Sequence, residues 1–263
     1  MSLQDPKLHE MIPAERRGRI VEILRARRAV RVSLLSEELG VSEMTIRRDL
    51  ERLESEGLLS RTHGGALLKR HMVGEPLYVD SVLTHAEEKR RIAEAAAAMI
   101  APGETVFLSS GTTAAQVLRH VDRQMEARVI THNMGALAEA AGLRVELILL
   151  GGHYRPQTNA VEGLYPVDLV SDFYAGKMLL GPDGVSLEEG LTTPSIGAAA
   201  VERAMLAQTR GELIVLADSS KIGVVADVAI CALERADVVI VDDGITKSVL
   251  EELRRLRLRV VVV

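Results

Sequence analysis

The sequence predicts an α/β protein in two parts: a small, mainly helical N-terminal domain and a larger domain built on a mostly parallel sheet. Three observations support this fold class. The length of 263 residues suits one small and one medium domain. Residues 1–70 combine helical periodicity with a hairpin pattern, whereas residues 87–263 alternate helices with short Val/Ile/Leu runs. Residues 71–86 lack clear periodicity and are expected to form a linker.

The N-terminal domain is predicted to hold three helices and a hairpin. A first helix is expected over Ala14–Arg27, after Pro13. Ser33 is expected to cap a second, whose apolar side is Leu34, Leu35 and Leu39. Ser42 is expected to cap a third, from Glu43 to about Glu56, with Ile46, Leu50 and Leu53 on one side. Leu58–Thr62, the pair Gly64-Gly65 and Ala66–Leu68 then read as a hairpin.

The larger domain is predicted from seven apolar runs that alternate with helices, the first of which is Glu87–Ile100. Uninterrupted apolar strands indicate burial on both faces of a mostly parallel sheet. The runs are Thr105–Leu108, Arg128–Thr131, Val145–Leu150, Lys177–Leu180, Leu213–Ala217, Val238–Val241 and Leu258–Val263. Ligands of such sheets bind at the carboxyl ends of the strands.

Composition narrows the class of protein further. The single cysteine, Cys231, fits a reducing compartment, and no Cys/His cluster has zinc-ligand spacing, so we expect no metal or cofactor. We also expect no signal peptide and no membrane span, and therefore a cytoplasmic protein. Residues 1–70 contain 14 Lys and Arg against 11 Asp and Glu, whereas the remainder contains 18 against 26. A net positive N-terminal segment followed by a net negative remainder favours a DNA-binding module attached to a domain of another kind.

Residues 32–51 have the pattern of a helix-turn-helix. The start of its second helix presents Met44, Thr45, Arg47 and Arg48, where such a helix reaches base edges in the major groove. Arginine can contact guanine, and Ser42 and Thr45 can bond phosphates or bases. Arg61, His63 and Gly64 would form a wing along the DNA backbone. The alternative is a solvated helix face on which Arg47 pairs with Glu51.

A family resemblance favours the DNA-binding interpretation. ERRGRIVEIL at 15–24 and VSEMTIRRDLERLESEGLLSRTHGGA at 41–66 resemble the winged helix-turn-helix domain of the DeoR family of bacterial regulators. The resemblance implies that Thr45, Arg47 and Arg48 face DNA. It also implies a homo-oligomer, a dimer or a tetramer, on repeated or palindromic operator half-sites.

Polar loops after the predicted strands suggest a binding site for a phosphate or polyol. Hydroxyl and backbone N–H groups of the 109–113 loop meet at the start of a helix, while Arg155 and Lys221 add cationic groups. Each loop taken alone is also explained as a plain turn or helix cap. The candidate residues from these loops are Ser110, Gly111, Thr112, Thr113, Arg155, Asp183, Gly184, Asp218, Ser219 and Lys221.

The same family resemblance extends over this half. SGTT at 110–113, LLGGHYRP at 149–156, GPDG at 181–184, GLTT at 190–193 and DSSK at 218–221 resemble the family's sensor domain, which is similar in fold to ribose-5-phosphate isomerase. The resemblance implies that Gly111, Thr112, Thr113 and Lys221 hold a phosphate, and that Asp183 and Thr192 contact the sugar. The chain departs from the family pattern at Ser109, usually aspartate, at 196–199, where glutamates are usual, and at Pro182 in GPDG, where GADG is commoner.

The predicted function is therefore a DNA-binding transcriptional regulator. The resemblance implies a repressor of a carbohydrate operon that a phosphorylated sugar or sugar alcohol releases from its operator. The main alternative is a sugar-phosphate isomerase with an accessory DNA-binding domain, in which Asp183 is the base and no partner acid is evident. A constitutive architectural DNA-binding protein is a third reading. RNA or single-strand binding is disfavoured because aromatic residues make up only 2% of the chain.

Overall fold

The computed structural model describes residues 11–27, 29–62, 64–68, 70–72 and 74–263. Contacts divide the chain into two compact units. One holds the described residues up to Arg70 together with Thr246–Arg255, and the other holds those in His71–Ile245 and Leu256–Val263. No described helix is both long and apolar enough to cross a membrane.

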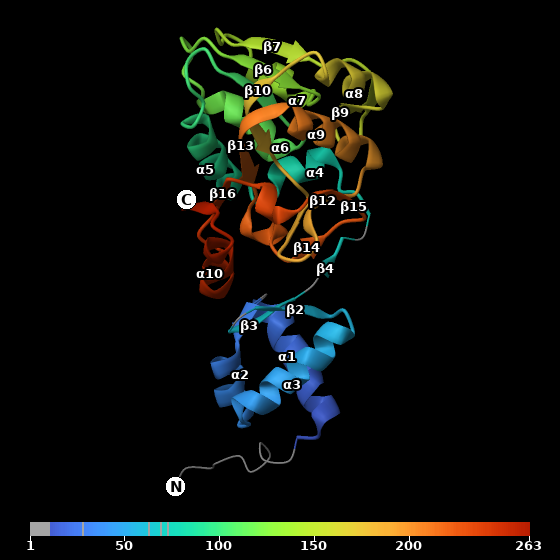
Figure 1. Cartoon of the computed structure of the whole chain (residues 1–263), viewed down its shortest axis with the longest axis vertical. Helices are drawn as coiled ribbons and strands as arrows, with labels where there is room; N and C mark the ends of the chain where they lie inside the picture. The colour runs from blue at the N-terminus through green and yellow to red at the C-terminus, as the bar shows by residue number, and fades with distance from the viewer. Residues whose placement is uncertain (1–10, 28, 63, 69, 73) are drawn as a thin grey trace. The chain divides into compact units, whose positions relative to one another are not determined.

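The described residues of the first unit up to Arg70 form three helices and a small antiparallel sheet (Figure 1). The sheet has the strand order β1-β3-β2, in which β2 and β3 form the predicted hairpin. Apolar side chains from the helices and from β2 make its core, and Ile20, Leu24, Leu35 and Ile46 are fully buried. The elements are α1 (Pro13–Arg27), β1 (Ala29–Arg31), α2 (Val32–Leu39), α3 (Glu43–Ser55), β2 (Leu59–Thr62) and β3 (Gly65–Leu68).

The start of α2 differs from the prediction. Ser33 is not its cap, because the helix begins at Val32, directly after β1. The Val32 N–H donates to the Gly64 carbonyl (2.8 Å), so the hairpin supplies the acceptor that a capping side chain would otherwise supply. Val32, Leu35 and Leu39 form the buried face, which leaves Leu34 47% exposed and not on the apolar side as expected.

The second unit is built on a seven-stranded parallel sheet with the order β17-β16-β13-β10-β5-β6-β7. Each of the seven predicted apolar runs contributes one strand, which confirms the predicted sheet. Helix α5 packs against β13 and β16, whereas α9 packs against β10 and β13. The strands are β5 (Thr105–Leu108), β6 (Arg128–Thr131), β7 (Glu146–Leu149), β10 (Ala175–Leu180), β13 (Thr209–Leu216), β16 (Val238–Val241) and β17 (Arg259–Val262).

Helices connect these strands, and α5 corresponds to the helix expected over Glu87–Ile100. An additional short helix, α4, lies within residues 71–86, the segment expected to be an irregular connection. The helices are α4 (Tyr78–Leu83), α5 (Ala86–Ala97), α6 (Thr112–Val117), α7 (Gly135–Glu139), α8 (Leu164–Val170), α9 (Ile196–Gln208) and α10 (Lys247–Arg255). By its contacts, α10 belongs to the first unit.

Short antiparallel strands decorate the sheet. Two motifs that read as polar loops in the sequence fold into such strands, since Gly184 pairs with Thr192 in the β11–β12 ladder. The Met72 N–H donates to the Val225 carbonyl (2.8 Å), which ties the start of the second unit to its strands. The short strands are β4 (Arg70–His71), β8 (His153–Arg155), β9 (Ala160–Glu162), β11 (Gly184–Ser186), β12 (Gly190–Thr193), β14 (Val224–Val225) and β15 (Val228–Cys231).

Candidate functional site

Helix α3 presents the polar face expected of a recognition helix. The Ser42 Oγ accepts a hydrogen bond from the Thr45 N–H (3.2 Å), so Ser42 caps the helix as predicted. Met44 is 59% exposed, and Arg47 and Arg48 are exposed beside it. Arg47 pairs with Glu43 (3.0 Å) and not with Glu51. Within the described part of the chain Arg48 makes no ion pair, which leaves its guanidinium available to a base or a phosphate.

The predicted wing residues are only partly free. Arg61 is held against α3, because its guanidinium pairs with Glu51 (2.7 Å) and its N–H donates to the Glu54 carboxylate (2.8 Å). The Gly64 carbonyl accepts from Val32. His63 lies outside the described residues.

A buried ion pair that sequence reasoning missed holds α3 in place. The Arg16 Nε donates to the Asp49 Oδ2 (2.5 Å), and both side chains are nearly buried. Arg17 lies 3.8 Å from the other oxygen of the Asp49 carboxylate. Asp49 stands between exposed Arg48 and buried Leu50, so the pair joins α1 to the helix that carries the candidate DNA-contacting residues. An acidic residue amid arginines reads as a surface charge in sequence, which is why it was overlooked.

We expect Arg48 to be the more important of the two adjacent arginines. Arg48→Ala should weaken operator binding by about 1–3 kcal/mol and relax the preference at one base pair if the side chain reads a base. Arg47→Ala should cost less, because the Arg47–Glu43 pair must break before Arg47 reaches DNA. Fluorescence anisotropy with single-base operator variants measures both effects. Arg52→Ala, at the opposite end of α3, is the matched control. An equal loss on every sequence with a reduced salt slope would instead assign Arg48 to a phosphate.

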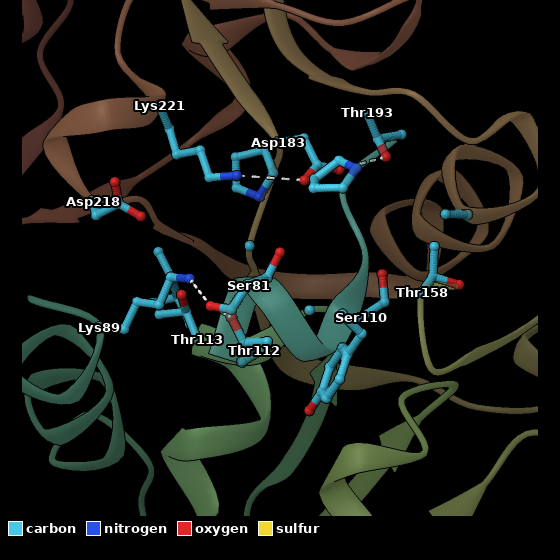
Figure 2. A pocket seen from close by; sticks show the side chains of 18 of the residues that line it. Ser81, Lys89, Ser110, Thr112, Thr113, Thr158, Asp183, Thr193, Asp218 and Lys221 are labelled. Carbon is cyan, nitrogen blue, oxygen red and sulfur yellow. Dashed lines mark hydrogen bonds and ion pairs between the residues drawn. The ribbon is translucent and has the colours of Figure 1, made fainter. Parts of the chain in front are cut away.

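The second unit contains a polar pocket at the carboxyl ends of β5, β10 and β13. It brings together seven of the eleven predicted effector residues (Figure 2): Ser110, Gly111, Thr112, Thr113, Asp183, Asp218 and Lys221. Residues that sequence reasoning missed complete the wall: Glu75, Pro76, Tyr78, Ser81, Lys89, Thr158 and Thr193, with backbone and apolar atoms between them. Tyr78 and Ser81 come from α4 and Lys89 from α5.

Buried side chains fix the loop that follows β5. The Gly181 N–H donates to the Ser109 Oγ (2.9 Å), so Ser109, the residue in the place of the usual aspartate, joins the 109–113 loop to the GPDG loop. The Asn133 Nδ2 donates to the Ser109 and Gly111 carbonyls (3.2 and 2.9 Å). His132 positions Ser110, because its Nε2 accepts a hydrogen bond from the Ser110 N–H (3.2 Å). That N–H is therefore not available to a ligand.

The environment of His132 keeps its imidazole neutral. Burial lowers the pKa of His132 to about 4, although a hydrogen bond to the Val161 carbonyl opposes the shift. Because the Nε2 accepts from Ser110, the Nδ1 carries the proton and donates to Val161 (3.0 Å). His132 is thus a fixed support for the pocket loop at neutral pH.

Lys89 places a cationic group at the pocket. Only 5% of the residue is exposed, and its Nζ donates to the Ser81 carbonyl (2.5 Å). Burial lowers the pKa of Lys89, and nearby Lys221 adds to the shift, whereas Asp218 and Asp183 oppose it. Among the described residues no carboxylate reaches ion-pairing distance of this ammonium. A buried ammonium without a paired anion is suited to an anionic ligand.

Acceptors for hydroxyl groups lie on the other side of the pocket. The Asp183 carboxylate accepts from the Thr193 hydroxyl (2.9 Å) and lies 3.5 Å from the Lys221 Nζ, as Figure 2 shows. Asp218 also faces the pocket, and its Oδ1 accepts from the Ser220 N–H (3.0 Å). The pocket thus combines two lysines and several hydroxyls with three carboxylates, of which Glu75 is paired with Arg155. This set can bind a ligand with one anionic end and several hydroxyl groups.

The remaining predicted effector residues do not line this pocket. The Arg155 guanidinium is engaged by Glu75 (2.6 Å) and Glu162 (3.2 Å) in a neighbouring hollow. Ser219 donates its N–H to Asp242. Thr192 accepts the Ala226 N–H (2.9 Å) within the short strands, and Gly184 packs against Thr192 and Val224, so both have structural roles. Thr193, the next residue, carries the hydroxyl that was expected of Thr192.

The departure at 196–199 also has a physical reason. A side chain at Gly197 would overlap the Glu162 carboxylate, which accepts from Ser195 (2.8 Å) and Arg155. Helix α9 instead carries a buried carboxyl at Glu202, one turn further along. Its Oε1 accepts from the Ser110 hydroxyl (3.4 Å), and burial raises the pKa of Glu202 well above its usual range. Glu202 stands behind Ser110 and is not among the residues that line the pocket.

Comparisons with known proteins match the two parts of the chain to two domain families. Residues 16–71 match the DeoR-like helix-turn-helix domain, and residues 84–243 match the DeoR C-terminal sensor domain. The putative aga operon transcriptional repressor of Escherichia coli O157:H7 is 35% identical over 255 residues, which cover 95% of this chain and 94% of that protein. The glycerol-3-phosphate regulon repressor of Escherichia coli K12 is 31% identical over 245 residues, which cover 92% and 96%. Ribose 5-phosphate isomerase A from Methanocaldococcus jannaschii aligns at 19% identity with a TM-score of 0.40, over 53% of this chain and 55% of that one.

A helix-turn-helix joined to a sensor domain with a polar pocket defines a DNA-binding regulator of transcription. The chain belongs to the DeoR family of such regulators. The predicted fold class, with its winged helix-turn-helix and mostly parallel sensor domain, is confirmed.

Proposed function

We propose that this regulator is a repressor that leaves double-stranded operator DNA when a phosphorylated sugar or sugar alcohol occupies the sensor pocket. Lys89 is the observation that carries the proposal. Among the described residues, the buried ammonium donates only to the neutral Ser81 carbonyl, and it is therefore suited to a phosphate. Lys221 adds a second ammonium, while Asp183 and Asp218 offer acceptors for hydroxyl groups. The relatives named for an aga operon and a glycerol-3-phosphate regulon support an effector of this class.

The proposal predicts a coupling between the two ligands. A saturating effector should weaken operator binding by about 5–150-fold, the range that corresponds to allosteric couplings of about 1–3 kcal/mol. The measurement is the fluorescence anisotropy of labelled DNA taken from upstream of the gene cluster that encodes this protein. The protein–DNA complex is titrated with a panel of sugar phosphates and polyol phosphates. The unphosphorylated parent of each compound is the control, and inorganic phosphate tests the anion alone. Operator affinity indifferent to the whole panel would contradict effector release.

We further propose that the protein acts as a homo-oligomer and not as an enzyme. Paired half-sites need two recognition helices, and exposed Leu164, Tyr165 and Ile196 offer apolar area that a second copy can bury. Against catalysis, Asp183 is already engaged by Lys221 and Thr193, and the buried acid Glu202 stands behind Ser110. Sedimentation equilibrium tests the first proposal, and turnover assays on the effector that releases DNA test the second.

A further inference from the structure

One wall of the effector pocket is the chain that follows the DNA-binding unit. We name residues 75–85 the strap. Glu75, Pro76, Tyr78 and Ser81 of the strap line the pocket, and α4 lies within it. We call the first unit, which carries the helix-turn-helix, the DNA-binding unit. The chain leaves it for the first time after Arg70, and the strap begins five residues further along. The segment that closes the pocket therefore follows one of the covalent connections between the two units.

Polar contacts hold the strap on the sensor domain. At its start, Glu75 pairs with Arg155 (2.6 Å), and its carbonyl accepts from the Gln157 Nε2 (2.8 Å). The Tyr78 N–H donates to the Gln157 carbonyl (2.8 Å). At its other end, the Ser81 carbonyl accepts from Lys89 (2.5 Å) and from the Thr112 hydroxyl (3.5 Å). Both Lys89 and Thr112 line the pocket, so the strap is held by groups that an effector would also contact.

The strap buries little apolar surface. None of the α4 residues is buried, and Leu83 is 81% exposed. A segment with few buried apolar contacts separates from its domain at a small cost in free energy. The polar contacts therefore decide whether the strap stays in place.

An anionic effector competes with the strap for Lys89. The Ser81 carbonyl is a neutral acceptor, whereas a phosphate oxygen carries negative charge and adds the attraction between opposite charges to its hydrogen bond with the ammonium. The ammonium has three donors, so ligand binding draws the Lys89 Nζ toward the anion and exchanges part of its contact with the strap for a stronger one. The exchange needs no rearrangement of the buried sheet.

We propose that the strap transmits effector binding to the DNA-binding unit: it is docked through Lys89 and Arg155 when the pocket is empty, and an anion on Lys89 displaces it. This inference rests on the proposed function, since it assumes an anionic effector in this pocket. It adds the element that couples the two equilibria. Tyr78 and Gly135 are positioning residues in this scheme, because they set where the strap lies.

Gly135 allows the strap to be displaced without a change in any residue that lines the pocket. A Cβ at Gly135, the first residue of α7, would overlap the Tyr78 hydroxyl and approach the Tyr78 Cζ to 3.1 Å. Alanine is otherwise well tolerated in a helix. Gly135→Ala should therefore push the strap away, and Tyr78→Phe should restore its position by removing the hydroxyl.

The experiment measures operator Kd for the full chain in the absence of effector. Gly135→Ala should bind operator at least about 5-fold more weakly than the unmodified protein, which is the lower end of allosteric couplings. A saturating effector should then weaken it less than it weakens the unmodified protein. The double variant, Gly135→Ala with Tyr78→Phe, is compared with Tyr78→Phe alone. Its operator affinity should lie within about 2-fold of that single variant, because the cycle isolates the contact between residues 78 and 135.

The outcomes separate the strap from the pocket. The strap proposal is overturned if Gly135→Ala binds operator and responds to effector as the unmodified protein does. It is also overturned if the loss of operator affinity persists in the double variant. The cause would then be α7 itself or the contact of residue 135 with Asn133 (3.1 Å), which is present with either Tyr or Phe at position 78. Thermal unfolding of the same samples detects a folding defect, which the double variant should not show. An unmodified protein that no compound releases would refute the effector proposal instead.

Discussion

Replacing Asp49 by alanine is expected to abolish operator binding by unfolding the DNA-binding unit. The substitution removes one partner of the Arg16–Asp49 pair and leaves the Arg16 guanidinium nearly buried and without a carboxylate at 2.5 Å. Breaking a buried pair in this way costs about 3–5 kcal/mol. A unit of this size has a total stability of only about 3–10 kcal/mol, at about 0.05–0.15 kcal/mol per residue. The loss is therefore a large fraction of the stability of the unit.

A neighbouring residue provides the control. Glu51 lies two positions along α3 and pairs with Arg61 (2.7 Å), but both side chains are substantially exposed. Glu51→Ala should therefore cost less than about 1 kcal/mol. Urea unfolding followed by circular dichroism, together with operator binding, distinguishes the two variants. An Asp49→Ala protein that unfolds like the Glu51→Ala protein yet fails to bind DNA would assign Asp49 a direct role in DNA binding.

The sequence predicts the fold well where strands are buried on both faces, because such strands appear as short runs of apolar residues. The seven runs that form the parallel sheet are rich in Val, Ile and Leu, as expected of strands with helices packed on both faces. In α3, the Ser42 cap and the spacing of Ile46, Leu50 and Leu53 are local features, and the structure confirms them. The short strands around Gly184 and Thr192 escape such reasoning, because three or four residues carry no recognisable period.

The pocket was predictable only where glycine and hydroxyl residues directly follow a strand. Lys89 lies in the charged run EEKRR, and nothing in that run distinguishes the buried lysine from its exposed and half-buried neighbours. Tyr78 and Ser81 belong to a segment without periodicity. Arg155 has the chemistry of a phosphate ligand, but it pairs with two carboxylates, Glu75 from far along the chain and Glu162 from the neighbouring strand β9. These assignments depend on long-range contacts, which a local pattern does not contain.

Lys89→Met is expected to abolish effector release and, at the same time, to stabilise the sensor domain. The variant removes the buried ammonium but keeps an unbranched side chain of similar length. Loss of a hydrogen bond to a charged group costs about 1.5–3 kcal/mol, which corresponds to an effector affinity about 10–150-fold lower. Operator binding without effector should weaken by no more than it does in Gly135→Ala, because the variant also removes the contact between Lys89 and the Ser81 carbonyl that docks the strap. Isothermal titration with the effector and anisotropy with the operator measure the two quantities separately.

The gain in stability follows from the direction of the pKa shift. Burial lowers the pKa of Lys89 below its ordinary 10.5, so the folded protein binds this proton less tightly than the unfolded chain does. The ammonium therefore destabilises the fold fully below the lowered pKa, and the penalty disappears as the pH rises above 10.5. Lys89→Met should raise the free energy of unfolding at neutral pH, by on the order of 1 kcal/mol, and the gain should shrink in alkali.

The pH dependence of effector affinity provides an independent check. The unmodified protein should lose affinity for the anion as the pH rises through the lowered pKa of Lys89, whereas Lys89→Met should bind weakly with no such alkaline loss. Lys247→Met, at an exposed lysine, is the control and should change neither stability nor effector affinity appreciably. If Lys89→Met were stabilised yet released by effector as before, the anionic end of the ligand would lie at Lys221, and the buried lysine would serve the strap alone.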